Sequence, residues 1–140
     1  MIAQIIYLPQ YDWTVVVYYC QEGYCKSTIL NTLKSSGCTK DILGSINDIM
    51  NEGLNTGFTY SNEKHRTSYM AIGPADSSKE FQNTYAHEKG HTVSYIAEAC
   101  SIDFTSEEYQ YLMGDLSESM FEIAQRYLCD DCEYSKVREA

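Results

Sequence analysis

The sequence predicts an α+β fold: a small twisted sheet of about four strands, two scaffold helices, one long helix that carries a polar motif, and a C-terminal helix. Two observations predict it. Runs of β-branched and aromatic residues come in two pairs, and each pair is followed by segments with apolar residues at helical spacing. With 140 residues and 44% hydrophobic composition, we expect one compact domain, 1–140, with a core of its own.

The expected strands form two hairpins. Pro9 interrupts the first β-prone run, and the run that follows contains Val15, Val16 and Val17, a pattern typical of a strand buried on both faces. A charged turn joins the second pair. The four strands are expected at 2–8, 13–20, 55–62 and 66–72.

The strand at 66–72 leads directly into the motif helix and is stopped by Pro74. An exposed edge strand can pair with an extended peptide chain. We therefore expect the strand at 66–72 to lie at an edge, either in that role or as an ordinary edge strand.

Two scaffold helices are expected between the hairpins, at 26–35 and 39–51. Both carry leucine and isoleucine at helical spacing, and they stop at Gly37 and Gly53. No residue in them indicates chemistry.

The C-terminal helix is expected from 105 to about 128. Thr105 is the predicted N-cap, with Glu108 completing a capping box. An apolar stripe runs along this helix, and Gly114 in its middle predicts close packing against a neighbouring element.

The motif helix is expected at 78–100 and contains His87-Glu88-x-x-His91. Ser77, followed three residues later by Glu80, offers a capping box at its start. His87 and His91 lie one turn apart on a helix, on the face opposite its apolar arc. Two imidazoles at this spacing can reach a single metal ion.

This motif predicts a catalytic zinc site. Zn²⁺ binds neutral imidazole nitrogen readily, and a catalytic site adds a third protein ligand while leaving one position to water. Zinc makes that water acidic enough to react near neutral pH. Glu88, which lies beside the first histidine without binding the metal, is the predicted general base.

The third metal ligand has two candidates. His65 lies in a charged turn, where exposure is the common outcome, and Glu98 lies about 10 Å beyond His91 along the helix, at 1.5 Å per residue. Glu107 and Glu108 open the next helix, and a short turn can bring its start beside the histidines. Helical phase favours Glu108, at the edge of the buried stripe.

From residue 55 onward the chain resembles the gluzincin-type zincins, metallopeptidases in which an H-E-x-x-H helix is followed by a helix that supplies a glutamate ligand. Most of the chain is similar to small peptidases carried by phages and mobile elements of gut bacteria. Four segments carry the likeness: 55–62, Asn83-Thr84 with His87-Glu88-x-x-His91, Glu107-Glu108-x-x-Tyr111-Leu112-x-Gly114-Asp115, and Leu128-Cys129-Asp-x-Cys132.

This resemblance implies a zincin-like fold, a zinc cofactor and hydrolysis of a peptide or protein substrate. Gluzincins often show Glu-x-x-Ala/Ser-Asp around the third ligand. This chain keeps only the spacing of that pattern, in Glu107-x-x-Gln110-Tyr111, and the spacing favours Glu107 as the ligand. Helical phase favours Glu108 instead, so both candidates stay open.

Composition excludes some partners and indicates a compartment. A formal net charge of −10 disfavours nucleic acid, whose phosphates are held by Lys and Arg. The N-terminus lacks a basic region ahead of its apolar residues, and no run is long enough to span a bilayer, so a cytoplasmic location is expected. The six cysteines are then expected to be reduced thiols.

Two other functions are compatible with these residues. Cys129-x-x-Cys132 can supply half of a structural zinc site, with Cys20 and Cys25 or Cys100 completing it. The acidic composition is also compatible with a non-catalytic interaction protein, such as a DNA mimic that blocks a DNA-binding protein.

Overall fold

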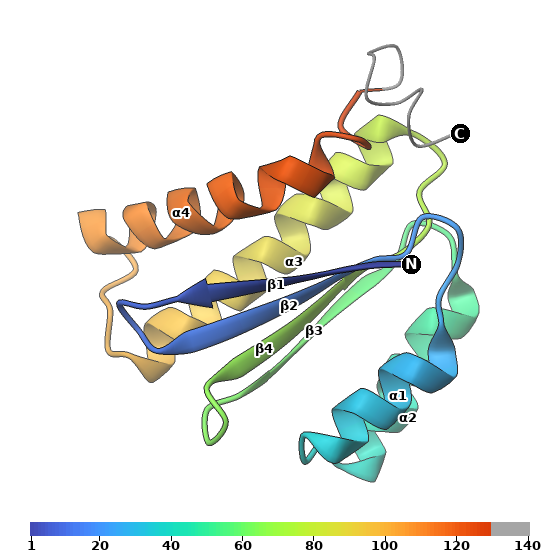
Figure 1. Cartoon of the computed structure of the whole chain (residues 1–140), viewed down its shortest axis with the longest axis horizontal. Helices are drawn as coiled ribbons and strands as arrows, with labels where there is room; N and C mark the ends of the chain where they lie inside the picture. The colour runs from blue at the N-terminus through green and yellow to red at the C-terminus, as the bar shows by residue number, and fades with distance from the viewer. Residues whose placement is uncertain (130–140) are drawn as a thin grey trace.

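The computed structural model describes residues 1–129 and has an α+β fold built on a four-stranded sheet (Figure 1). The strands lie in the order β1-β2-β4-β3, so β1 and β3 form the two edges. Both hairpins are antiparallel as predicted, and β2 pairs with β4 in parallel. The strands are β1 (Ile2–Leu8), β2 (Trp13–Tyr19), β3 (Gly57–Asn62) and β4 (Thr67–Ile72).

Two pairs of helices cover the two faces of this sheet. The first pair, α1 (Lys26–Ser35) and α2 (Lys40–Glu52), matches the predicted scaffold helices, with Thr39 as the N-cap of α2. Their isoleucines and leucines pack against Tyr18, Phe58 and Ala71 of the sheet.

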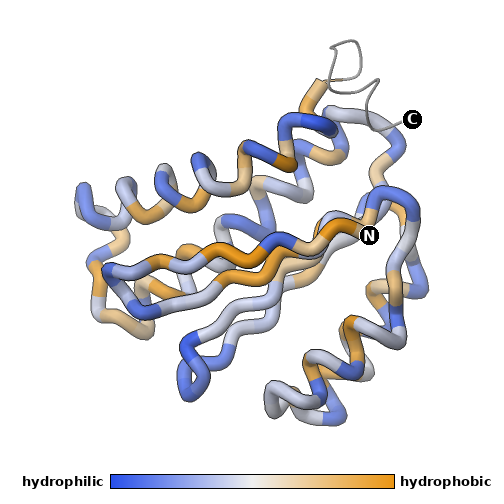
Figure 2. The backbone as a smooth tube through the Cα atoms, viewed as in Figure 1, coloured by the Kyte–Doolittle hydropathy of each residue, from blue (hydrophilic) through white to orange (hydrophobic). Residues whose placement is uncertain are grey.

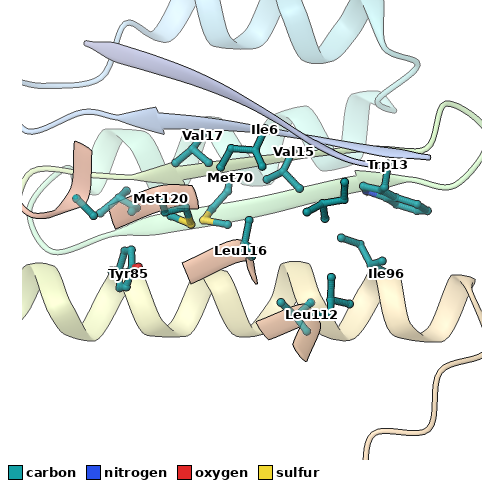
Figure 3. Close-up of a cluster of buried hydrophobic side chains, with 14 of the residues drawn as sticks. Ile6, Trp13, Val15, Val17, Met70, Tyr85, Ile96, Leu112, Leu116 and Met120 are labelled. Atoms are coloured by element: carbon teal, nitrogen blue, oxygen red, sulfur yellow. The ribbon is translucent and has the colours of Figure 1, made fainter. Parts of the chain in front are cut away.

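The second pair is α3 (Ser78–Ala99) and α4 (Glu107–Ala124), which lie together on the opposite face. Apolar residues of β2 and β4 meet both helices there, and Figure 3 shows the stripe of α4 pointing at the same core as Val15 and Met70. Figure 2 shows the corresponding pattern along the chain, with apolar residues concentrated in β1 and β2 and alternating polar and apolar residues in the helices.

Three local predictions are wrong. The hydroxyl that caps α4 belongs to Ser106, which accepts from the Tyr109 N–H, because the Thr105 N–H and hydroxyl both donate to the Asp103 carboxylate two residues earlier. α4 ends at Ala124 rather than near 128. Gly114 lies on the exposed face of α4, and a side chain there would meet no atom within 4 Å, so it serves no close packing.

The predicted position of the strand that precedes the motif helix is also wrong. β4 leads into α3 but lies between β2 and β3, because its parallel pairing with β2 places it inside the sheet. The edge beside α3 is therefore β3, one strand earlier in the chain.

Among residues 1–129, no helix is both long and apolar enough to cross a lipid bilayer.

α3 packs closely against the sheet at Gly57 in β3. A β-carbon at this position would lie 2.7 Å from the Thr84 methyl carbon, 2.8 Å from the Ala71 carbonyl oxygen and 3.0 Å from Cγ of Glu88. Only glycine therefore lets α3 lie this close to β3.

We predict opposite effects for two glycine-to-alanine substitutions. Gly57→Ala should destabilise the protein by roughly 1–3 kcal/mol, because the added methyl overpacks the contact between α3 and β3. Gly114→Ala should stabilise it by up to about 1 kcal/mol, because alanine is the better helix former at an exposed position. Denaturant unfolding measures both, and a neutral Gly57→Ala would contradict the close packing.

Candidate metal centre

The predicted motif is gathered on one side of α3. Ser77 caps the helix as predicted, with its hydroxyl accepting from the Glu80 N–H at 3.2 Å. His87 and His91 are exposed, and their Nε2 atoms lie 3.1 Å apart. The ligand atoms of these two residues and of Glu88 all lie within 4.8 Å of one another, and no other such group of three occurs in residues 1–129.

The geometry of the two imidazoles fits a bound metal ion. Two nitrogens that bind one tetrahedral zinc ion at 2.0–2.1 Å lie about 3.3 Å apart. The observed separation of 3.1 Å is close to this value. In the metal-free protein one Nε2–H can donate to the other Nε2, so metal binding replaces a single hydrogen bond. The pair is suited to hold a divalent ion with very little rearrangement.

Glu88 differs from the histidines in being buried. Its side chain is 6% exposed and points toward β3, where the Thr59 hydroxyl lies 3.0 Å from Oε1 and 3.2 Å from the Glu88 carbonyl oxygen. Burial raises the pKa of the Glu88 carboxyl above its usual value, against the Thr59 hydrogen bond and the charge on the two imidazoles, which lower it. The carboxylate is thus held in place and made more basic than an exposed one.

The group opens into a hollow of about 690 Å³. Residues of α3 form one wall, β3 runs along the hollow, and α2 forms the opposite wall. The α2 wall presents three isoleucines, Ile42, Ile46 and Ile49, together with Asp41 and Ser45. The isoleucines of α2 have the spacing of an ordinary core helix, so their spacing does not indicate that this helix forms a wall of the hollow.

The backbone of β3 is free along this hollow. The Gly73 N–H donates to the Thr56 carbonyl, so the even-numbered residues of β3 are the ones that pair with β4. Hydrogen-bonding directions alternate along an antiparallel strand, so Gly57, Thr59 and Ser61 direct their N–H and C=O groups away from β4. All three line the hollow.

The structure does not bring Glu107 or Glu108 into the metal group. Glu108 accepts a hydrogen bond from the Tyr11 hydroxyl at 3.1 Å and lines a separate hollow with Tyr111 and Asp115. The reason is the side on which α4 packs: α4 contacts β1, whereas α3 contacts β3 and β4. Their role as third ligand stays a prediction that no described contact supports.

The other residues considered from the sequence are scattered. His65 is exposed in the turn between β3 and β4, outside the metal group. Tyr95 of α3 lines the hollow together with His91 and packs against Trp13. Cys132 lies outside the described residues, so the C-x-x-C zinc site stays a prediction.

Comparison with family models, with curated proteins and with solved structures gives no match. The interpretation therefore rests on the residues of this chain. His87, Glu88 and His91 form a group of H-E-x-x-H type on α3 that could bind a metal ion.

We predict that replacing His87 or His91 by alanine abolishes zinc binding at this site, because each change removes one of its two nitrogen donors. His65→Ala is the matched control, since it removes an exposed histidine outside the group. Competition with a chromophoric chelator measures the affinity, and the Tm gives a second reading because a ligand of the folded state raises it. A His91→Ala protein that binds zinc as tightly as the wild type would place the ion elsewhere.

Proposed function

We propose that this protein is a zinc-dependent hydrolase that cleaves peptide bonds. The main support for this proposal is the arrangement of three side chains on α3. Two exposed imidazoles lie 3.1 Å apart beside a buried, hydrogen-bonded carboxylate, and all three line an open hollow. A purely structural metal site would be closed by four protein ligands.

The residues of the site have distinct roles in this reaction. His87 and His91 would hold the ion through Nε2. A bound zinc ion would supply an acidic water and polarise the carbonyl that is attacked. Glu88 would take a proton from the attacking water and deliver it to the leaving amine, a role for which burial makes its carboxylate more basic by raising its pKa. Thr59 positions the carboxylate through its hydroxyl.

The free edge of β3 supports a peptide as the substrate. Gly57, Thr59 and Ser61 offer backbone donors and acceptors along the hollow, and an extended peptide can add to such an edge as a further strand. Main-chain hydrogen bonds would hold the substrate beside Glu88, whichever side chains it carries.

For the third ligand we propose a carboxylate, and two sources are to be compared. Glu107 and Glu108 are favoured by the likeness to gluzincins alone, and α4 would have to shift to bring either of them near. Asp41 of α2 is favoured by a different observation, because it lines the same hollow as the two histidines.

The alternative of an acidic interaction protein is supported by the net charge of −10. It requires neither zinc nor Glu88. A single substitution at Glu88 therefore separates the two functions, because it should strongly lower hydrolysis by a peptidase and leave the binding of an interaction protein unchanged.

We predict that Glu88→Gln keeps zinc binding and lowers peptide hydrolysis by about 10²- to 10⁴-fold, because an amide of the same shape cannot accept the proton. Hydrolysis is measured on a mixed peptide library by mass spectrometry. Glu118→Gln, which changes an exposed carboxylate on α4, is the control and should leave hydrolysis unchanged. Equal turnover in Glu88→Gln would remove Glu88 from the mechanism.

A second prediction identifies the third ligand. Among Asp41→Asn, Glu107→Gln and Glu108→Gln, one should weaken zinc binding by more than about tenfold, which is the loss expected even for a residue that only supports a ligand. The other two should bind zinc like the wild type. If none of the three weakens binding, neither helix supplies a carboxylate ligand.

A further inference from the structure

The hollow at the metal group continues in both directions along β3. A second hollow, of about 320 Å³, shares Gly57, His87 and Glu88 with it, and a third, of about 310 Å³, shares Tyr95. We call the three together the β3 groove. It passes from the loop before β3, across the metal group, to the turn after β3.

The middle of the β3 groove is apolar. Ile42 and Ile46 of α2 and Phe58 of β3 line it opposite the histidines. Ile42 is 41% exposed, so its side chain is available to an apolar group bound in the groove. The volume of about 690 Å³ is ample for a bulky apolar side chain together with the backbone that carries it.

Both ends of the β3 groove are acidic. Apart from Glu88, two glutamates line the hollow before β3, two line the hollow after it, and one aspartate lies on the α2 wall between them. No lysine or arginine lines any of the three hollows, although the chain has ten of these residues. Besides Glu88, the acidic residues are Glu52 and Glu80, Glu63 and Glu98, and Asp41.

We infer that the β3 groove selects an extended cationic peptide, with a bulky apolar residue near the cleaved bond and lysine or arginine on both sides. This inference rests on the proposed peptidase function and names its substrate class. Since the middle hollow follows β3 from Gly57 to Ser61, the basic residues lie about two to four positions from the apolar one, at 3.3–3.4 Å per residue.

Charge complementarity explains why such a peptide is preferred. Carboxylates at both ends of a partly enclosed groove attract a basic chain and speed its encounter. The same carboxylates repel an acidic peptide and the phosphates of a nucleic acid. The free backbone edge of β3 sets the register, and the apolar middle sets which residue lies over Glu88.

The test uses three synthetic peptides of equal length with a central leucine and flanking lysines, glutamines or glutamates. Binding to the Glu88→Gln protein, loaded with zinc, is measured by fluorescence anisotropy at low and high salt. The paired variant Glu80→Gln with Glu98→Gln removes one carboxylate from each end of the groove. Glu118→Gln with Glu122→Gln makes the same change in net charge on the exposed face of α4 and is the control.

The lysine peptide is expected to bind at least about tenfold more tightly than the glutamate peptide, and high salt should shrink this difference. The groove variant should reduce the preference several-fold more than the control variant does. Equal binding of the three peptides, binding of none, or equal loss in both paired variants would overturn the inference.

Cleavage by the zinc-loaded wild type separates this inference from the function on which it rests. If the lysine peptide binds selectively but no peptide is cleaved, the peptidase proposal fails and the cationic preference stands. If all three peptides are cleaved at equal rates, the peptidase proposal stands and the inference about charge fails.

Discussion

The contact between β3 and α3 at Gly57 is the constraint on which the site depends. It brings the helix close enough for the Thr59 hydroxyl to reach the Glu88 carboxylate, and so buries that carboxylate against the sheet. Relative to Glu88, His87 is rotated by about 100° and His91 by about 60° around the helix axis, both in the same direction. The same packing that buries Glu88 therefore leaves His87 and His91 facing outward, where they can bind an ion and remain open to a substrate.

The two faces of the sheet contribute to the site in different ways. The core between the sheet and the α3–α4 pair fixes the phase of the motif helix, through residues such as Tyr85, Val93 and Ile96. The core on the other face holds α2 beside the edge of β3, and this placement turns an open strand edge into a groove with two walls. Because β3 is an edge strand between these two layers, its backbone is available beside the metal group.

Features encoded by neighbouring residues could be predicted from the sequence. The two hairpins, the scaffold helices, the Ser77 cap and the shared face of His87 and His91 all follow from local spacing, and the structure confirms them. Features set by long-range packing could not. Periodicity does not tell which strand lies beside which, so β4 was expected at an edge although its pairing with β2 places it inside.

The same limit explains the third ligand and the role of α2. Chain proximity suggested that the start of α4 returns to the histidines, but α4 packs toward β1, and Glu108 bonds to Tyr11 instead. The isoleucines of α2 have the same spacing whether they face a core or a groove, so no sequence signal marks them as a wall. The prediction that residues 1–140 form a single domain includes residues outside the described part of the chain and stays a prediction.

We propose that His87 and His91 bind one zinc ion together. X-ray absorption spectroscopy of the zinc-loaded protein tests this proposal most directly, because it reports the atoms that surround the metal. Two imidazole nitrogens are expected at about 2.0–2.1 Å, with oxygen donors in the remaining positions. A shell dominated by sulfur at about 2.3 Å would assign the zinc to cysteines and contradict the proposal.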